Sequence, residues 1–372
     1  MGFIIKEISK SSDIKKFIKF PHKLYKSCKQ YVPSLDAEEF AALTKSPSLE
    51  YCKIRLWMAY SDKGEIIGRI AGIHNPRSNE YHNEKKIRFG WFDFIDDKEV
   101  ATALLAKVEE WGLEMNMEQM HGPLGYNTWG KQGILVEGFE HIPPINCLYN
   151  YEYYPQIMEE LGYEKQVDWI QVKLKADVGV PDKLKRINQM LLDKYNLKVL
   201  DIRKLKSLDK YADSFFKSYH EGFKNIVNFV PLTDKEQESI VKEYFSKLRQ
   251  ELTCIIVDKD DNIAAFGICI PNLSRSFQKT KGRLYPFGIF HIMREFKKYD
   301  TIDLMMVASA SEWHNKGISS IYHTFIATNL HRGTIKYAIT NPQNEYNLAT
   351  KVWDRYGYDP YMRRRCYIRD IK

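Results

Sequence analysis

The sequence is poor in the features that mark membrane-spanning, secreted and disulfide-bonded proteins. No stretch approaches about 18 consecutive apolar residues, so we expect no transmembrane helix. The first ten residues alternate apolar and charged side chains and lack the apolar centre of a signal peptide. The six cysteines are scattered, without a Cys-x-x-Cys pair, which favours reduced thiols in a cytoplasmic protein.

The sequence also lacks the common motifs of nucleophilic and of metal-dependent catalysis. Neither Ser nor Cys stands in a nucleophile elbow, and the chain has no His-Glu-x-x-His pattern. We therefore expect no metal site. Charged residues (28%) are spread along the chain beside 44% hydrophobic residues, a composition that excludes a disordered protein.

What is present indicates a large folded protein with an excess of positive charge. The 372 residues predict two domains of about 180 residues each. The 56 basic residues outnumber the 48 acidic ones, which gives a net charge of +8. This charge favours polyanionic partners, namely a nucleotide cofactor, nucleic acid or an anionic membrane surface.

The two halves of the chain share one pattern of elements. Each half reads as strand, turn, strand, strand and amphipathic helix, and it closes with a Gly-aromatic stop before a last strand. In the first half these elements cover residues 55–60, 66–74, 87–95, 98–116 and 167–174. In the second half they cover residues 253–257, 263–270, 301–309, 318–330 and 364–368. Two copies of a mixed α/β unit are therefore predicted, with a seam near residues 176–182.

One segment interrupts the second copy. Residues 271–300 are rich in Arg, Lys, Phe, Tyr and Gly, and they are too long for a hairpin connection. Two interpretations stay open, a lid or wall of a substrate channel and a structural decoration.

The strongest chemical signal lies between the strand at 301–309 and the helix that follows it. The loop includes His314, Asn315, Lys316 and Gly317. A glycine lets the backbone approach a ligand, and the free N–H groups of the helix's first turn attract an anion. An ordinary polar loop is the alternative interpretation.

This loop resembles the pyrophosphate loop of the GNAT acyltransferases, which runs Arg/Gln-x-x-Gly-x-Gly/Ala. His314 replaces the usual Arg or Gln, and Ser319 replaces the last small residue. The resemblance implies an α/β fold of two tandem GNAT lobes, residues 1–178 and 179–372, with acyl-coenzyme A as a substrate of the second lobe. It implies these cofactor-binding residues: Met306, Val307, Ala308, His314, Asn315, Lys316, Gly317, Ile318, Ser319 and Asn347.

The first half resembles the same fold without the loop. Its third strand runs into the helix through Asp96 and Asp97 and without a glycine. Two carboxylates suit a helix start but repel a pyrophosphate. We therefore expect the first lobe to bind no coenzyme A.

Longer stretches resemble the bacterial ceramide synthase-like branch of tandem GNAT proteins. They are residues 121–125, 133–139, 149–154, 228–233 and 271–273. The resemblance implies transfer of a fatty acyl group, from coenzyme A or an acyl carrier protein, to a lipid amine such as a long-chain amino alcohol.

Transfer of an acyl group to an amine requires a base. The best candidate is Asp303, which precedes Gly317 by 14 positions on the strand that leads to the loop, where some GNAT enzymes carry a catalytic carboxylate. Strand alternation places Asp303, Met305 and Val307 on one face. A structural ion pair is the alternative role for Asp303. Glu221, beside His220, is a second candidate, on a helix that borders the acceptor site in GNAT folds.

The start of the closing helix supplies the remaining candidates. Glu345 and Asn347 match a Glu-x-Asn element of the family, which implies that they bind the amine or the cofactor, with helix capping as the alternative. The usual GNAT tyrosine, which protonates the leaving thiolate, aligns with Trp353, and indole is not an acid at neutral pH. Water, Tyr346 or Tyr356 would then protonate the thiolate.

Two rival functions stay open. A degenerate GNAT pair could serve as a binding or scaffold protein, and an aminoacyl-tRNA-dependent transferase also pairs two GNAT lobes. The phosphate loop argues against the second, so nucleic acid is not the favoured partner. The basic run at residues 363–365 is either a peripheral membrane contact or a solvated strand end.

Overall fold

The computed structural model describes residues 2–176, 179–331, 335–347 and 357–372. The chain forms two compact units that each combine segments far apart in sequence. Unit 1 contains Met1–Ile170, Leu273–Lys297 and Tyr361–Lys372, and unit 2 contains Gln171–Asn272 and Lys298–Pro360. The boundary expected at residue 178 lies outside the described residues.

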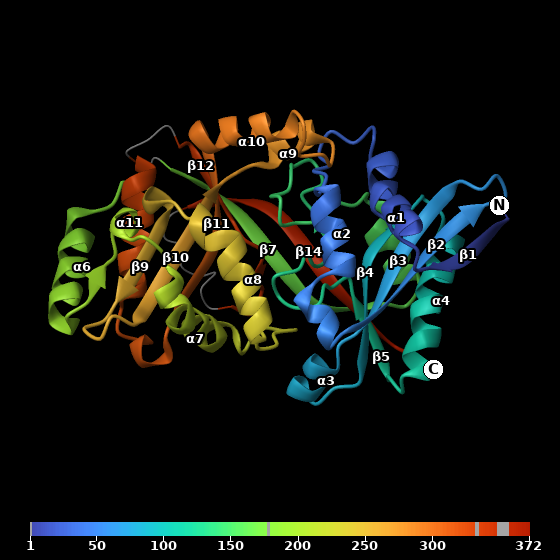
Figure 1. Cartoon of the computed structure of the whole chain (residues 1–372), viewed down its shortest axis with the longest axis horizontal. Helices are drawn as coiled ribbons and strands as arrows, with labels where there is room; N and C mark the ends of the chain where they lie inside the picture. The colour runs from blue at the N-terminus through green and yellow to red at the C-terminus, as the bar shows by residue number, and fades with distance from the viewer. Residues whose placement is uncertain (1, 177–178, 332–334, 348–356) are drawn as a thin grey trace. The chain divides into compact units, whose positions relative to one another are not determined.

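Unit 1 is built on a mixed sheet with the strand order β1-β2-β3-β4-β5-β14, and β6 lies beside β14 (Figure 1). Its strands are β1 (Phe3–Ile8), β2 (Lys53–Ser61), β3 (Ile66–His74), β4 (Lys86–Phe94), β5 (Gln119–Gly122), β6 (Ile134–Glu137), the first part of β7 (Glu164–Lys175) and β14 (Tyr358–Asp370). Its helices are α1 (Ser11–Leu24), α2 (Asp36–Thr44), α3 (Pro76–His82), α4 (Lys98–Glu114), α5 (Tyr153–Glu160), α9 (Ser274–Thr280) and α10 (Gly288–Lys297). Only the β4–β5 pair is parallel among the described pairs of this sheet.

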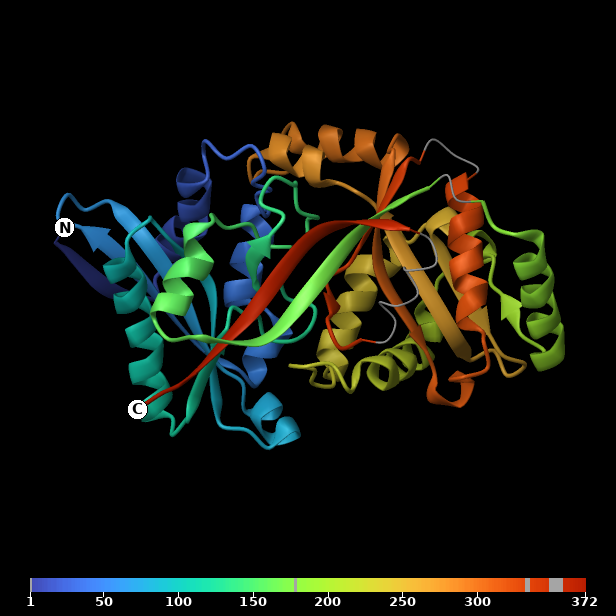
Figure 2. The same cartoon turned by 180° about the vertical axis from the view of Figure 1, so that it is seen from behind.

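Helices cover both faces of the unit 1 sheet because its strands are apolar on both sides. Leu56 and Met58 of β2 pack in a cluster with Phe17 of α1. The alternate residues Trp57 and Ala59 pack in a second cluster with residues of α4 and α5. Helices α4 and α5 therefore share the face that Figure 2 shows toward the viewer.

In unit 2 the strand order is β7-β12-β11-β10-β9-β8, with β13 beside β7. Its strands are the second part of β7, β8 (Lys198–Val199), β9 (Thr253–Val257), β10 (Ile263–Pro271), β11 (Thr301–Ser309), β12 (Tyr337–Thr340) and β13 (Gln343–Asn344). Its described α-helices are α6 (Asp182–Tyr195), α7 (Ala212–Phe223), α8 (Asp234–Tyr244) and α11 (Ser319–His331). Short 3-10 helices lie between them, among them η6 (Ser311–Trp313) directly after β11.

Helices α7 and α11 lie on opposite faces of the unit 2 sheet. Phe215 of α7 stacks on Phe266 of β10, with ring centroids 4.4 Å apart. The next residue, Gly267, faces Tyr322 of α11, since a Cβ at Gly267 would lie 3.3 Å from that side chain. The paired hairpins, third strands and helices expected from the sequence are thus confirmed, with ends that differ by a few residues.

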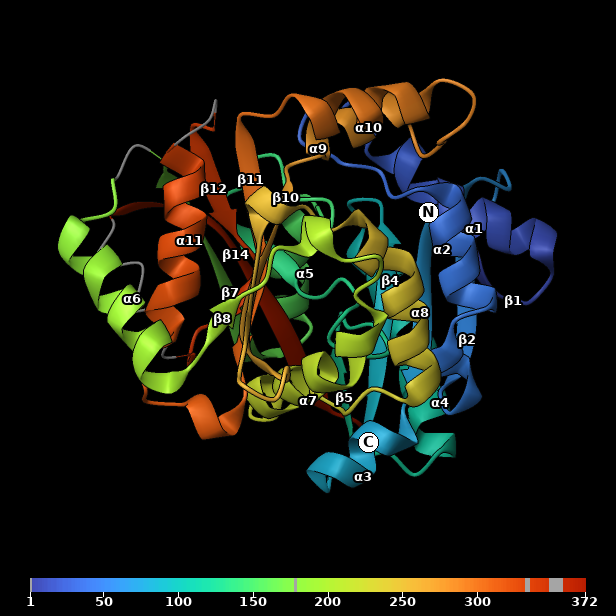
Figure 3. The same cartoon turned by 60° about the vertical axis from the view of Figure 1, so that its left-hand side comes forward.

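The interrupting segment forms α9 and α10, which pack on unit 1. Leu273 and Phe277 are buried in a cluster with Val32 and Leu35. Helices α9 and α10 lie side by side (Figures 1 and 3), joined by a hydrogen bond from the Ser276 hydroxyl to the His291 carbonyl.

The basic run at residues 363–365 is largely paired within unit 1 and is not a fully solvated strand end. Arg364 is 0% exposed. Arg363 and Arg365 both donate hydrogen bonds to Asp168, which is itself buried. Among the described helices, none is both long and apolar enough to cross a membrane.

Candidate functional site

The strand β11 has one open edge in its second half. It pairs in parallel with β12 from Thr301 to Leu304, and the Asn341 amide donates to the Leu304 carbonyl at 2.9 Å. From Met305 to Ser309, β11 pairs only with β10 among the described residues. An edge without a partner strand in the described chain is suited to pairing with an extended ligand.

A β-bulge interrupts β11 at the start of the open edge. Ile268 of β10 pairs with Met306 and Cys269 pairs with Leu304, so Met305 has no opposite residue. The strict alternation expected from Asp303 through Met305 to Val307 is therefore wrong. Bulges of this kind re-aim side chains and are frequent next to active sites.

The open edge leads into the loop that the sequence singled out. Asn315 has φ +61° and Gly317 has φ +77°, both in the left-handed region, where glycine is favoured. In the described part of the chain, no acceptor is found for the backbone amides of Asn315, Gly317, Ile318 and Ser319. Helix α11 begins at Ser319, so these donors gather at its positive end.

The loop's charged side chains lie at the surface. Lys316 is exposed, and its Nζ lies 4.5 Å from the centre of the Trp313 ring. The exposed His314 ring lies across the loop, where its Nε2 donates to the Ser309 carbonyl at 3.0 Å. Free amides and a lysine at a helix N-terminus form an arrangement suited to a phosphate or diphosphate.

Glu221 holds the beginning of this loop. Its carboxylate accepts a hydrogen bond of 2.6 Å from the backbone amide of Ser311. Helix α7 approaches β11 closely here, because a Cβ at Gly222 would lie 3.1 Å from the Cβ of Ala308. The neighbouring His220 accepts a hydrogen bond from the Leu232 amide through Nε2, which occupies that nitrogen.

Asp303 lies in the interior of the sheet, two positions before the bulge. It is 2% exposed, and burial raises its pKa to about 7, although the hydrogen bond from Asn272 acts in the opposite direction. The Asn272 amide donates to Oδ1 at 2.7 Å. No described group bonds to the other oxygen, Oδ2. A buried carboxyl with one unused oxygen and a pKa near neutrality suits a general base.

The remaining candidates lie after β12. The Asn344 side chain accepts from the Tyr346 amide, and the Asn344 carbonyl accepts from the Asn347 amide, both at 2.9 Å. Glu345 is half-buried within this turn. Tyr356 and Trp353 lie outside the described residues. No described group of three His, Cys, Asp or Glu side chains could hold a metal ion.

The equivalent edge in unit 1 is filled by the chain itself. Strand β4, the counterpart of β11, pairs in parallel with β5 only as far as Arg88. Beyond that point the Leu124 amide donates to the Phe89 carbonyl at 2.8 Å. Arg88 is buried and donates to the carbonyls of Gly125 and Tyr126. Unit 1 therefore uses this edge for internal hydrogen bonds.

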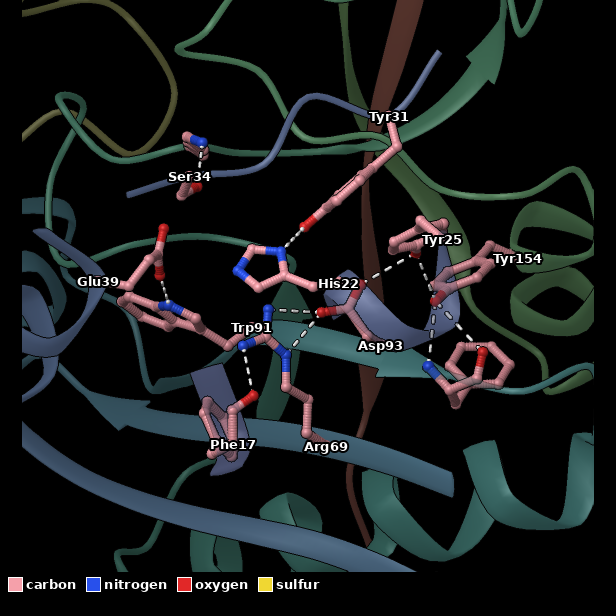
Figure 4. A network of polar contacts seen from close by, with 12 residues as sticks. Phe17, His22, Tyr25, Tyr31, Ser34, Glu39, Arg69, Trp91, Asp93 and Tyr154 are labelled. Carbon is pink, nitrogen blue, oxygen red and sulfur yellow. Dashed lines mark hydrogen bonds and ion pairs between the residues drawn. The ribbon is translucent and has the colours of Figure 1, made fainter. Parts of the chain in front are cut away.

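Unit 1 instead contains a polar network that the sequence analysis missed (Figure 4). Arg69 donates through Nε to Asp93 at 2.7 Å and through Nη1 to the Phe17 carbonyl at 2.9 Å. The Tyr25 hydroxyl donates to Asp93 and lies 2.8 Å from the hydroxyl of Tyr154. Arg69 and Asp93, charged residues in the middle and near the end of largely apolar strands, were the available sequence signal.

The network continues toward α2. The Trp91 Nε1 donates to Glu39 at 2.6 Å, and Trp91 has φ +44°, a strained value for a bulky residue. Burial alone would raise the pKa of Glu39, but the charges of Lys131 and Arg69 outweigh it, so the pKa is lowered. His22 bridges Tyr31 and Asp36 in the same region. These contacts tie α1 and α2 to the sheet.

A cavity of about 960 Å³ lies elsewhere in unit 2. Its walls include Ala212 and Phe216 of α7 and Gln237 and Val241 of α8. None of the candidate site residues that the structure describes lines it. Glu221, at the other end of α7, faces the loop instead.

Comparison with known proteins supports the architecture. No family model matches the sequence. Protein YghO of Escherichia coli (strain K12) is 24% identical over 380 residues, which cover 99% of this chain and 95% of that protein. Bacterial ceramide synthase of Caulobacter vibrioides is 24% identical over 314 residues, covering 82% and 80% of the two chains. A solved tandem GNAT protein from the clavulanic acid biosynthesis pathway (without AcCoA) has a TM-score of 0.57 at 10% identity, with 100% of this chain and 99% of that chain covered. The chain thus has a tandem GNAT fold of the α/β class, and its sequence is similar to that of a bacterial ceramide synthase.

Proposed function

We propose that the protein is an acyl-coenzyme A-dependent N-acyltransferase whose site lies along β11 of unit 2. One observation carries the proposal. The open edge of β11 leads directly to four backbone amides that have no acceptor in the described chain, at Asn315, Gly317, Ile318 and Ser319. The diphosphate of coenzyme A would bind these amides beside Lys316, and the pantetheine arm would pair with the edge from Met306 to Ala308.

In this proposal Asp303 is the general base. The acceptor nitrogen attacks the thioester carbonyl carbon, and Oδ2 of Asp303 takes the proton that the nitrogen releases. Collapse of the tetrahedral intermediate breaks the C–S bond and gives an amide and a thiolate. Water or Tyr346, which is 71% exposed, then protonates the thiolate. No covalent enzyme intermediate is needed, because a thiolate is a good leaving group.

The acceptor is proposed to be a lipid amine of the long-chain amino alcohol class. The support for this substrate is the similarity over most of the chain to a protein named bacterial ceramide synthase. Glu345 is proposed to bind the acceptor's amine near the end of β12, and Asn347 to contact the cofactor.

Coenzyme A binding is the direct test of the loop. Thermal unfolding is followed at increasing concentrations of coenzyme A. At a concentration a hundred times the dissociation constant, binding should stabilise the folded protein by about 2.7 kcal/mol. Gly317→Ala should abolish this shift, because φ +77° disfavours a side chain. Gly162→Ala is the matched control. Gly162 also has φ +77°, a Cβ there would meet no atom within 4 Å, and the residue lies in unit 1.

Substrate identity requires a second assay. The enzyme is incubated with acyl-coenzyme A thioesters of several chain lengths and a long-chain amino alcohol, while thiol release and N-acyl product are followed by absorbance and mass spectrometry. Product should form with wild type and not with Asp303→Asn. Binding of coenzyme A without any product in this panel would contradict the proposed acceptor class. Absence of coenzyme A binding would contradict the proposed transferase activity and favour a scaffold protein.

A further inference from the structure

The segment Leu273–Lys297 presents apolar side chains to solvent at high density. Tyr285 and Phe287 are each 73% exposed, Phe290 is 66% exposed and Met293 is 50% exposed. These four side chains fall within nine positions of the sequence. Exposed apolar groups gathered in this way mark an interaction surface rather than scattered surface residues.

The same segment is strongly basic. It carries six Lys and Arg residues against one acidic residue, Glu295. Lys281, Arg283, Arg294 and Lys297 are exposed, and within the described chain none of them forms an ion pair. Glu295 is half-buried and accepts a hydrogen bond from the Ser276 hydroxyl. The positive charge of the segment is therefore available to a partner.

Helix α10 combines both properties on one side. Ile292 and Phe296, four positions apart, pack against the unit 1 cluster around Leu35 and Phe277. Phe290 and Met293, three positions apart, point away from that cluster, and Arg294 and Lys297 follow on the same exposed face. The inward face fixes the helix to unit 1 and leaves the aromatic and basic face outward.

We propose that this surface docks the protein on an anionic membrane. A helix that joins exposed aromatic and basic side chains lies in the interface plane, with its apolar groups at the acyl boundary and its cations at the headgroups. Anionic headgroups complement Lys281, Arg283, Arg294 and Lys297, and their long stems let the charges reach the headgroups. This docking surface shares no residue with the coenzyme A loop and does not depend on the proposed reaction.

Vesicle co-sedimentation tests the proposal on the full-length protein. Wild type should bind vesicles of phosphatidylglycerol and phosphatidylcholine, bind weakly to phosphatidylcholine alone, and be released by added salt. Phe287→Ser with Phe290→Ser should lower the partition constant at least about tenfold. Arg294→Gln should lower it about fivefold.

Matched controls separate docking from general effects. Met190→Ser removes a side chain that is 68% exposed on α6, and Lys183→Gln removes an exposed charge of the same helix. Both should bind vesicles like wild type. The phenylalanine variant should keep its melting temperature and its coenzyme A-induced shift, so a failure of docking is distinguishable from a failure of the loop.

Three results would overturn docking. The first is equal binding to neutral and anionic vesicles, and the second is full vesicle binding by the phenylalanine variant. The third is a wild type that binds no vesicles and is a dimer in sedimentation equilibrium, while the phenylalanine variant is a monomer. The surface would then join two copies of the chain.

Discussion

At the residue scale, the environment of Asp303 disfavours the charged form of its carboxyl group, and the proposed role of a general base makes use of the raised pKa. The carboxyl group is buried, and only one of its oxygens has a hydrogen-bond partner among the described residues. In the folded protein its pKa is about 7, against 3.8 for an ordinary aspartate. Burial of this group therefore costs stability at neutral pH, which is a common feature of catalytic groups.

Replacement of Asp303 by asparagine should separate stability from activity. Between pH values of about 4 and 7 the folded state holds a proton that the unfolded chain has lost, so stability falls as the pH rises. Asparagine does not ionise. Asp303→Asn should match wild type near pH 4 and exceed its unfolding free energy above pH 7, by up to about 4 kcal/mol.

Urea denaturation across this pH range measures the difference, and the acyl-transfer assay measures the loss of activity. The wild-type rate should rise with pH through about 7, as the base loses its proton. If the difference in unfolding free energy between Asp303→Asn and wild type were the same at all pH values, the pKa of Asp303 would not be raised in the folded protein.

Two substitutions of Glu221 distinguish a role in positioning the loop from a role as the catalytic base. Its carboxylate accepts from the Ser311 amide, and the side-chain carbonyl of glutamine could do the same. Glu221→Gln should therefore keep both kcat and the KM for acyl-coenzyme A. Glu221→Ala should raise that KM about tenfold with little change in kcat, because the loop loses its anchor. If Glu221→Gln lost kcat instead, Glu221 would be the catalytic base.

At the scale of the elements, the equivalent strands β4 and β11 have diverged at one edge. Among the described residues the edge of β11 beyond Leu304 has no partner strand and Asp303 stands before it, whereas in β4 the segment around Leu124 fills the edge and Arg88 binds its carbonyls. The sequence anticipated a difference between the lobes from the acidic helix start at Asp97. The structure locates a second difference in the strand edges.

Close packing at the filled edge makes Gly90 sensitive to substitution. A Cβ at Gly90 would lie 2.5 Å from the Leu124 carbonyl oxygen, a backbone atom that cannot rotate away. Gly90→Ala should therefore lower the unfolding free energy by about 1–3 kcal/mol. Gly179→Ala is the control, because nothing lies within 4 Å of that position. Equal stability of the two variants, measured by urea denaturation, would contradict the filled edge.

The ion pair at the centre of the unit 1 network should matter more than any exposed pair. Arg69 and Asp93 have side chains only 8% and 12% exposed. Asp93→Ala leaves a buried guanidinium without its partner and should cost about 3–5 kcal/mol. Glu160→Ala removes the exposed pair with Lys98 and should cost less than about 1 kcal/mol. Urea denaturation measures the unfolding free energies of both variants. A similarly small loss in the two would show that the Arg69–Asp93 pair is accessible to water.

Local sequence patterns predicted the elements but not the defects within them. The strands at 66–74 and 301–309 were recognisable because apolar runs end at turn residues, and their bounds are confirmed. The bulge at Met305 was not recognisable, since it depends on the register with β10, a partner chosen by the whole sheet. For the same reason Asp303 was identified as a candidate while its unused oxygen was not.

At the scale of the whole molecule, the order of the sequence and the composition of the units differ. Two sequential lobes were expected, but Leu273–Lys297 and Tyr361–Lys372 belong to unit 1, while β7 passes from unit 1 into unit 2. A strand's alternation identifies its buried face and says nothing about which strands it pairs with. The repeat could therefore be read from the sequence, whereas the exchange of the last strands could not.

This exchange predicts that the first half of the chain does not fold alone. Within unit 1, β14 pairs with β5 and β6, and Cys366 and Tyr367 of β14 are 0% exposed. A fragment of residues 1–178 would expose these strand edges and the core beneath them, which favours unfolding and aggregation. A peptide of residues 358–372 should restore part of its structure, because it supplies the missing strand. Circular dichroism melting and limited proteolysis of the fragment, with and without the peptide, measure this. A cooperative transition of the fragment alone would mean that the last strand contributes little to unit 1, and that the two lobes are independent in sequence as well as in fold.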